Sequence, residues 1–170
     1  MNITFPDGTV RQFEAGTSGM DIAKSISEGL ARVALGIFVD GVPYDLSRPI
    51  NNDATIRIVT FNDDDGKQIF WHSTAHLMAE ALESLYAGVK FGIGPSIENG
   101  FYYDVDLPNG KKLTPDDLPV IEAKMKELVK QNSHFSREEI TWEDAVAYFT
   151  EKGDEYKLEL LDGLKGSEIT

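Results

Sequence analysis

Residues 68–88 read QIFWHSTAHLMAEALESLYAG, a single helical run that carries two of the chain's three histidines. His72 and His76 stand four residues apart, and in an α-helix this spacing places both imidazoles on one face, about 6 Å apart along the axis. The two rings can therefore converge on one small target. A bare His-x-x-x-His has many chance matches, however, so helix geometry alone favours two solvent-facing histidines without a function.

The same run has an apolar side. At about 100° per residue, one broad stripe gathers the apolar side chains, while Ser73, Glu80 and Glu83 gather with the histidines on the other side. We expect the stripe to be packed and the histidines to point into a cleft. The residues of the predicted stripe are Phe70, Leu77, Met78, Ala81, Leu82 and Leu85.

Length and composition indicate a soluble globular protein. With 170 residues, of which 41% are hydrophobic, the chain can hold one ordinary domain or two small ones. No apolar run approaches the roughly 18 residues of a membrane helix, and residues 1–8 lack the pattern of a signal peptide. These features predict a cytoplasmic protein that does not bind a membrane.

Charge and cysteine content exclude several kinds of site. The chain has no cysteine, which excludes a disulfide, a thiolate nucleophile and a thiolate metal site within it. Twenty-nine acidic and sixteen basic residues give a formal charge of −13, which argues against tight generic binding to a phosphate backbone. Any contact with nucleic acid must therefore be local or shared.

The first sixty residues show the order β-β-α-β-β, with the helix on one face of a mixed sheet. Pro6-Asp7-Gly8 suits a tight turn between two short strands, and Thr17 or Ser18 can cap a helix that stops at Gly29. The predicted strands are 2–5, 9–13, 33–40, 44–45 and 54–61, and the predicted helix is 20–27.

Residues 62–66, NDDDG, form a polar acidic break that predicts a domain boundary. After the histidine helix, Asn109-Gly110 predicts a hairpin that joins strands 100–107 and 111–113. A helix is expected over 114–131, a strand over 135–140 and a helix over 142–152 with caps at Thr141 and Gly153. Residues 155–161 are ambiguous, and the sequence stops so abruptly after them that we expect it to end inside a domain.

Three segments carry a resemblance to a known family: HSTAHLMAEAL at 72–82, FGIGPSIENGFYYDVD at 91–106 and GDEYKLELL at 153–161. In this order, behind the β-β-α-β-β pattern, they resemble the N-terminal region of bacterial threonyl-tRNA synthetases. The resemblance implies an α+β chain with a ubiquitin-like β-grasp (TGS) domain at 1–62 and a linker at 63–66. Residues 67–170 would then be the first part of a tRNA-editing domain, with α/β structure and an antiparallel sheet.

The resemblance also implies a site. The family's editing site uses His-x-x-x-His, matched by His72 and His76, and a lysine matched by Lys157. A downstream Cys-x-x-x-His completes that site in the family and is missing here. Tyr103 and the 92–95 turn, with Gly94 and Pro95, are expected to help form the pocket wall. His134 does not match the missing element, and we interpret it as a loop residue.

An editing site answers a physical need. Serine differs from threonine by one methyl group, which is worth roughly 1–3 kcal/mol of discrimination. A second site can hydrolyse the serine ester of the tRNA, given a placed water, a base near it and a positive charge for the oxyanion. His72 and His76 suit the positioning of water and adenosine, and Lys157 suits the charge.

By resemblance, the complete protein would be a class II aminoacyl-tRNA ligase that edits seryl-tRNA(Thr), and this chain alone would be inactive. Its partner would be the acceptor end of tRNA(Thr). The chain would be monomeric, and the complete enzyme a homodimer. No cofactor is expected in these residues, because ATP, Mg²⁺ and Zn²⁺ would belong to the aminoacylation core.

Two alternatives remain open at this stage. The TGS-like half could be a docking module for RNA or a regulator without catalysis. The two histidines could instead belong to a zinc hydrolase, although catalytic zinc needs three protein ligands and only a carboxylate such as Glu80 could supply the third.

Overall fold

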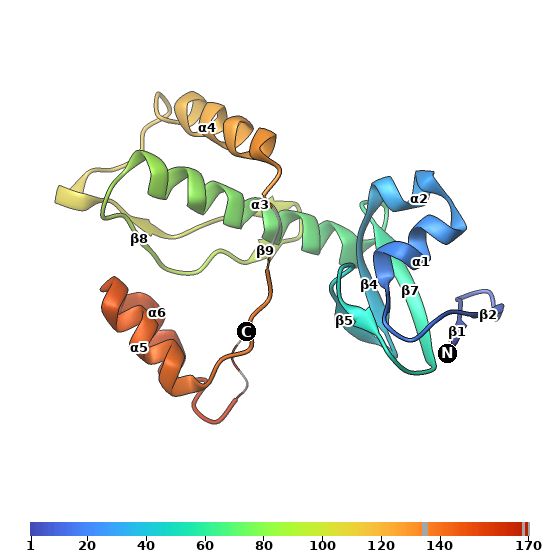
Figure 1. Cartoon of the computed structure of the whole chain (residues 1–170). Coiled ribbons are helices and arrows are strands. Elements are labelled where there is room, and N and C mark those ends of the chain that lie inside the picture. The colour runs from blue at the N-terminus through green and yellow to red at the C-terminus, as the bar shows by residue number, and fades with distance from the viewer. Residues whose placement is uncertain (134–135, 168, 170) are drawn as a thin grey trace. The chain divides into compact units, whose positions relative to one another are not determined.

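Figure 1 shows the computed structural model, which describes residues 1–133, 136–167 and 169. The chain divides into two compact units, Met1–Trp71 and His72–Thr170. Helices with mixed and antiparallel strand pairs make up an α+β fold, as predicted. Within the described residues, no helix has both the length and the apolarity needed to cross a membrane.

The first unit is built on a five-stranded sheet with the order β2-β1-β7-β4-β5. β1 and β7 run parallel, and the other neighbouring pairs are antiparallel, so the sheet is mixed as predicted. The predicted hairpin of β1 and β2 is confirmed, with Ile3 opposite Arg11. The strands are β1 (Asn2–Thr4), β2 (Val10–Gln12), β4 (Ala34–Val39), β5 (Val42–Tyr44) and β7 (Ala54–Thr60).

The helix of this unit begins where its capping residues predicted. Ser18 caps α1 (Gly19–Ile26) by accepting a hydrogen bond of 3.2 Å from the backbone N–H of Asp21. α1 ends within one residue of the predicted end at Ser27, but Gly29 is not a helix stop, because Ser27 caps a second short helix, α2 (Glu28–Val33), which includes Gly29. A serine hydroxyl that satisfies a free backbone N–H restarts the helix there despite the glycine.

The core of the first unit lies between the sheet and α1. Ile22 of α1 and Ile3, Ile37 and Ile56 of the sheet are at most 1% exposed. A short pair, β3 (Thr17–Ser18) with β6 (Pro49–Ile50), brings Ile50 onto the same cluster. The alternating apolar residues of the strands thus supply one buried face.

The long helix α3 spans Asp64–Leu85 (Figure 1). It starts four residues earlier than predicted, so the acidic break forms its first turn. The Asp63 carboxylate accepts hydrogen bonds from the N–H and hydroxyl of Thr60, at 2.8 and 3.1 Å. The helix then passes so close to β7 that a Cβ on Gly66 would lie 1.8 Å from the Thr60 carbonyl oxygen.

In the second unit, α3 packs against α4 (Leu118–Gln131). Ala81 and Leu82 of α3 meet Ile121 and Leu128 of α4, and all four are at most 8% exposed. Leu77, Met78 and Leu85 border this cluster, as the predicted stripe requires. Phe70 does not belong to it. It is 44% exposed and stacks edge-on against Phe61, with ring centroids 5.3 Å apart.

The predicted hairpin at Asn109-Gly110 is wrong. β11 (Val105–Asp106) pairs antiparallel with the earlier strand β8 (Lys90–Phe91), and β10 (Gly100–Phe101) pairs with β9 (Ser96–Ile97). Residues 108–110 form a 3₁₀ turn, and residues 111–113 form no strand. Just before β11, the backbone of Asp104 continues the pairing with the residues that follow β8. The Gly92 N–H donates to the Asp104 carbonyl oxygen (2.8 Å), and the Asp104 N–H donates to the Ile93 carbonyl oxygen (3.0 Å).

The remaining elements are helical. α4 begins at Leu118 rather than at residue 114, and residues 115–117 form a turn before it. The Asp117 carboxylate accepts hydrogen bonds from the N–H and hydroxyl of Thr114, both 2.8 Å. α5 (Trp142–Lys152) has the predicted caps at Thr141 and Gly153, and the ambiguous run is α6 (Glu155–Asp162).

The strand expected at 135–140 is wrong where it can be judged. Residues 136–139 form no strand, and Ile140 makes an isolated bridge to Ile169. An isolated bridge fixes one residue pair and leaves the neighbouring backbone groups outside a ladder. His134 and Phe135 lie outside the described residues.

Candidate functional site

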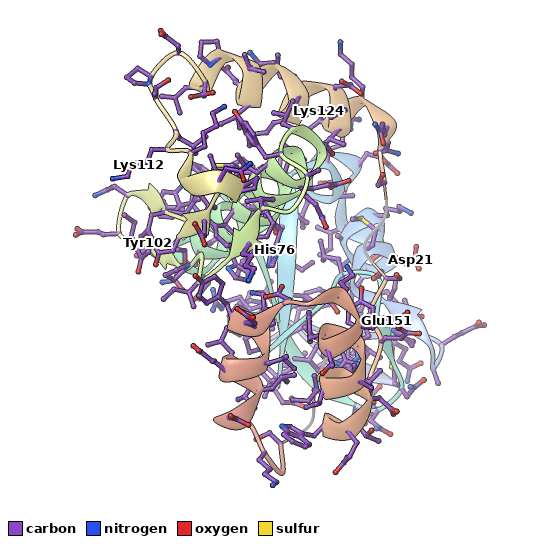
Figure 2. All side chains as sticks on the ribbon, turned by 90° about the vertical axis from the view of Figure 1, so that its left-hand side faces the viewer. Asp21, His76, Tyr102, Lys112, Lys124 and Glu151 are labelled. Carbon is purple, nitrogen blue, oxygen red and sulfur yellow. The ribbon has the colours of Figure 1, made fainter. Side chains whose placement is uncertain are left out.

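The two histidines of α3 contact each other directly. His72 Nε2 and His76 Nε2 are 3.2 Å apart, and the rings meet edge-on with centroids separated by 4.7 Å. A neutral imidazole has one N–H and one acceptor nitrogen, so one Nε2 donates to the other. Both residues are exposed. In Figure 2, His76 is labelled on the side of α3 that faces away from α4, and Lys124 marks α4 itself.

The surroundings of His76 favour its neutral form. Partial desolvation of the ring is the main cause that lowers the pKa of His76, although the residue as a whole remains exposed. The charges of His72 and Lys157 lower that pKa further. A lowered pKa means that the His76 ring stays unprotonated, and so able to accept a proton, down to a more acidic pH than an ordinary histidine.

Lys157 is positioned by the start of α6. The Asp154 carboxylate caps this helix and accepts a hydrogen bond of 3.1 Å from the backbone N–H of Lys157. The half-buried Lys157 side chain donates from Nζ to the carbonyl oxygen of Gly92 at 3.3 Å. Its charge acts on His76, so the structure brings the predicted lysine and the histidine pair within electrostatic range.

Tyr103 and Gly94 are in tight contact with each other. A Cβ on Gly94 would lie 2.5 Å from Cδ2 of the Tyr103 ring, so only glycine leaves room for the ring there. The other side of the ring meets Phe91 edge-on, with centroids 5.5 Å apart. Partial burial, followed by the charge of Asp154, raises the pKa of the Tyr103 hydroxyl. Pro95, the next residue of the turn, is half-buried.

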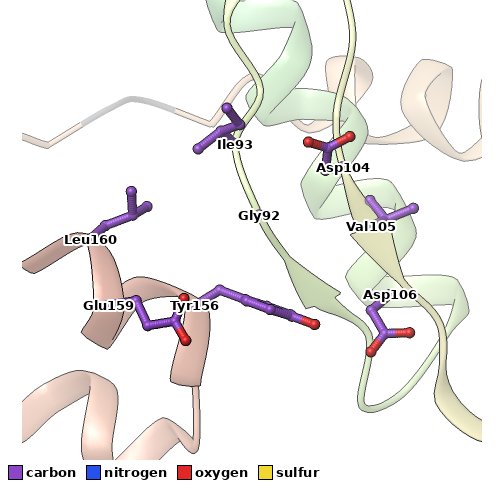
Figure 3. Close-up of a pocket in the computed structure, with 8 residues that line it drawn as sticks. All are labelled: Gly92, Ile93, Asp104, Val105, Asp106, Tyr156, Glu159 and Leu160. Atoms are coloured by element: carbon purple, nitrogen blue, oxygen red, sulfur yellow. The ribbon is translucent and has the colours of Figure 1, made fainter.

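A pocket of about 550 Å³ lies between α6 and the β8–β11 pair (Figure 3). Its lining does not include His72, His76, Lys157, Tyr103, Gly94 or Pro95, so among the described residues this hollow is distinct from the histidine pair. The sequence did not predict this pocket, although Gly92 belongs to the 92–95 turn expected to form a wall and Tyr156 precedes the predicted lysine. The lining residues are Gly92, Ile93, Asp104, Val105, Asp106, Tyr156, Glu159 and Leu160.

A zinc site built on His72 and His76 would need a third protein ligand near the two rings. Over the described ranges 1–133, 136–167 and 169, no group of three or more His, Cys, Asp or Glu side chains is arranged to hold a metal ion. Glu80, the carboxylate considered as a third ligand, is therefore not placed with His72 and His76 in such a group.

Comparison with known proteins agrees with the fold of the first unit. Residues 1–60 match the TGS domain family. Over all 170 residues, the chain is 55% identical to a threonine–tRNA ligase of Cytophaga hutchinsonii, 52% identical to one of Parabacteroides distasonis and 51% identical to one of Porphyromonas gingivalis.

Each comparison covers the whole of this chain and 26% of the relative's length. The matched share is the N-terminal part of those ligases, which begins with the TGS domain. Along its whole length, the chain is therefore similar to the N-terminal part of threonine–tRNA ligases, and its first 60 residues match the TGS domain.

Proposed function

We propose that the histidine pair and Lys157 belong to a site that hydrolyses seryl-tRNA(Thr), the misacylated product of a threonyl-tRNA synthetase. The observation that carries this proposal is the 3.2 Å contact between His72 Nε2 and His76 Nε2, together with the effect of Lys157 on the pKa of His76. A pair of imidazoles within electrostatic range of an ammonium group has the chemistry that ester hydrolysis requires.

In the proposed reaction, the pair orients and deprotonates a water molecule. Because one Nε2 donates to the other, the donor ring keeps a free acceptor at Nδ1 and the acceptor ring keeps an N–H there. The water oxygen attacks the ester carbonyl carbon while an imidazole takes its proton. The ribose oxygen then leaves and recovers a proton, which yields serine and tRNA with a free hydroxyl.

Lys157 would stabilise the negative charge that develops on the carbonyl oxygen. The Asp154 cap fixes its backbone, and the Gly92 carbonyl holds its ammonium group, so the charge is positioned before substrate binds. Fixed charges of this kind need no reorganisation during the reaction. Tyr103, held between Gly94 and Phe91, with Pro95 beside it, would form the wall that the aminoacyl end meets.

The 170 residues would supply only part of this site. The resemblance includes a Cys-x-x-x-His element, and the chain has no cysteine. Catalysis by positioning is steep, since a displacement of about 1 Å can cost about 10²-fold in rate. We therefore expect weak binding of the tRNA acceptor end and no useful deacylation by this chain alone.

The wider assignments follow the same proposal. The complete enzyme would be a cytoplasmic, homodimeric class II ligase, with ATP, Mg²⁺ and Zn²⁺ acting in its aminoacylation core. The TGS domain would occupy residues 1–62 and the editing region residues 67–170, joined by residues 63–66.

The test uses a chimera in which this chain replaces the matching 170 residues of the Cytophaga hutchinsonii ligase, to which it is 55% identical. The chimera should deacylate seryl-tRNA(Thr) faster than threonyl-tRNA(Thr), and His72→Ala or His76→Ala should each reduce that rate about 100-fold or more. His134→Ala serves as the histidine control and should leave the rate unchanged.

The chain alone is assayed in parallel. If it matches the chimera and loses that activity on His72→Ala, the site is complete without the Cys-x-x-x-His element. If the chimera keeps its rate in both variants of the pair, the histidines do not catalyse. Tight tRNA binding without deacylation would favour the docking module, and stoichiometric zinc in the purified chain would favour the metal hydrolase.

A further inference from the structure

The pocket between α6 and the β8–β11 pair combines apolar walls with separated carboxylates. Ile93, Val105 and Leu160 supply aliphatic surface, and Tyr156 extends its ring from α6 toward the strands (Figure 3). Its volume of about 550 Å³ lies in the range that small-molecule sites occupy, roughly 300–1,000 Å³. The lining therefore suits a ligand with an aliphatic body.

Charge decides the sign of that ligand. Asp104, Asp106 and Glu159 line the pocket, and no lysine, arginine or histidine does so among the residues that the structure describes. Among the residues that the structure describes, the carboxylates of Asp104 and Glu159 have no ion-pair partner. A cation would be attracted to this lining and an anion repelled from it.

Two lysines near the pocket are already engaged. Lys90 pairs with Glu155 at 3.0 Å, and its charge also interacts with Asp106 and Tyr156. Lys157 donates to the Gly92 carbonyl. Lys90 thus neutralises Glu155, whereas Asp104 and Glu159 have no ion-pair partner among the described residues and carry the uncompensated negative charge of the lining.

The spacing of the carboxylates separates an organic cation from a metal ion. Asp104 and Asp106 are two residues apart on an extended segment, which places them about 6–7 Å apart, and Glu159 comes from the opposite wall. Across the described residues, no three such groups converge tightly enough to hold a metal ion. Dispersed charges along an aliphatic wall match ammonium groups separated by a short carbon chain.

We propose that this pocket binds a linear aliphatic polyamine, with its ammonium groups against Asp104, Asp106 and Glu159 and its methylene chain against Val105, Leu160 and the Tyr156 ring. Carboxylates pair with the ammonium groups, and an aromatic face adds cation–π attraction. This site shares only Gly92 with the residues assigned to ester hydrolysis, and the polyamine proposal does not depend on that assignment.

The experiment titrates the 170-residue chain with spermidine by isothermal calorimetry and NMR, at constant ionic strength. Asp104→Asn combined with Glu159→Gln should weaken spermidine binding about tenfold, since each exposed ion pair contributes up to about a factor of five. The control variant Glu28→Gln with Asp45→Asn removes the same charge from exposed positions in the first unit and should bind as the wild type does.

A steric variant tests the location without changing charge. Leu160 is 43% exposed, so Leu160→Trp should fold, fill part of the pocket and abolish binding. Tyr156→Ala, which removes the aromatic wall, should weaken binding and provides a second measurement if the tryptophan variant is unfolded by circular dichroism. Folded variants of Leu160 and Tyr156 that bind like wild type would overturn the proposal.

Mg²⁺ serves as a competing cation, which tests whether spermidine is bound at this pocket or only attracted by the net charge of the chain. We expect Mg²⁺ at the same ionic strength neither to displace spermidine nor to shift the resonances of the pocket residues. Equal competition by Mg²⁺, or equal weakening in the Glu28/Asp45 control, would mean that spermidine responds to the net charge of the chain, and the proposed site would be refuted.

Discussion

Gly66→Ala should destabilise the protein although it places a better helix former in α3. In a helix, alanine is favoured over glycine by at most about 1 kcal/mol. At Gly66, however, the added Cβ would lie 1.8 Å from the carbonyl oxygen of Thr60 and 2.6 Å from its carbonyl carbon. Both atoms belong to the backbone of β7, so no side chain can rotate away.

The magnitude follows from what must move. Overpacking in a close contact costs about 1–3 kcal/mol. A shift of the first turn also strains the two hydrogen bonds from Thr60 to the Asp63 carboxylate, each worth about 1 kcal/mol. After subtraction of the propensity gain, we expect the free energy of unfolding to fall by about 2 kcal/mol.

Gly29→Ala is the matched control. This glycine is in α2, is exposed, and a Cβ there would meet only the Ser27 hydroxyl oxygen at 3.7 Å, an ordinary contact. The same substitution should therefore stabilise the protein by up to about 1 kcal/mol. Urea titrations followed by circular dichroism and by tryptophan fluorescence measure both variants. Stabilisation of equal size at the two positions would refute the reasoning from the close approach.

Three further predictions concern the second unit. Lys157→Met should raise the pKa of His76, because it removes one of the charges that lower it, and an NMR titration of the histidine Cε1–H resonances measures the shift. Leu82→Ala should reduce the free energy of unfolding by about 2–5 kcal/mol in a urea titration, since Leu82 is 1% exposed in the α3–α4 core. The backbone N–H of Thr114 holds the pKa of Asp117 well below its ordinary value, so this carboxylate contributes stability above its unfolded pKa that is lost as the pH falls through the folded pKa. Asp117→Asn should therefore flatten the acid limb of the stability profile, and an unchanged limb would contradict this assignment.

Local signals predicted the first unit well. The hairpin, the Ser18 cap and the alternating strands each depend on a few neighbouring residues, and the mixed sheet follows from their order. α2 was missed because Gly29 masks the cap that Ser27 provides. A hydroxyl three residues before a free N–H is the only signal for such a restart, and it is a common pattern.

The errors in the second unit have a different origin. Asn109-Gly110 has the dihedral signs of a tight turn, with φ of 62° and 67°, yet the strand before it pairs with residues 90–91. Which partner a strand chooses depends on residues far along the chain, and turn chemistry does not report it. The capping residues at 114–117 were recognised correctly as a local signal, but they form a turn and the α-helix begins only at Leu118.

The candidate site was predicted in part. Helical periodicity placed His72 and His76 opposite the apolar stripe, where both are exposed, and their ring contact follows from the i, i+4 spacing. That they point into a cleft stays a prediction, because neither lines the pocket described above. The contact of Lys157 with the Gly92 carbonyl joins residues 65 positions apart, and the sequence alone offered no physical basis for it beyond the resemblance. The pocket between α6 and the β8–β11 pair was not predicted, because its walls come from three separate elements.

The parallel pairing of β1 with β7 determines when the first unit can fold during synthesis. Ile3 lies opposite Ala54, and the Asp53 carboxylate accepts a hydrogen bond of 2.7 Å from the Asn2 backbone N–H, so the first strand needs a partner made about fifty residues later. At about 5–20 residues per second, the ribosome takes seconds to supply that partner. Until then the edge of β1 that pairs with β7 has no partner, and an isolated hairpin is marginally stable at best. Folding of this unit should therefore begin only after β7 has left the exit tunnel, in one late step that closes the sheet.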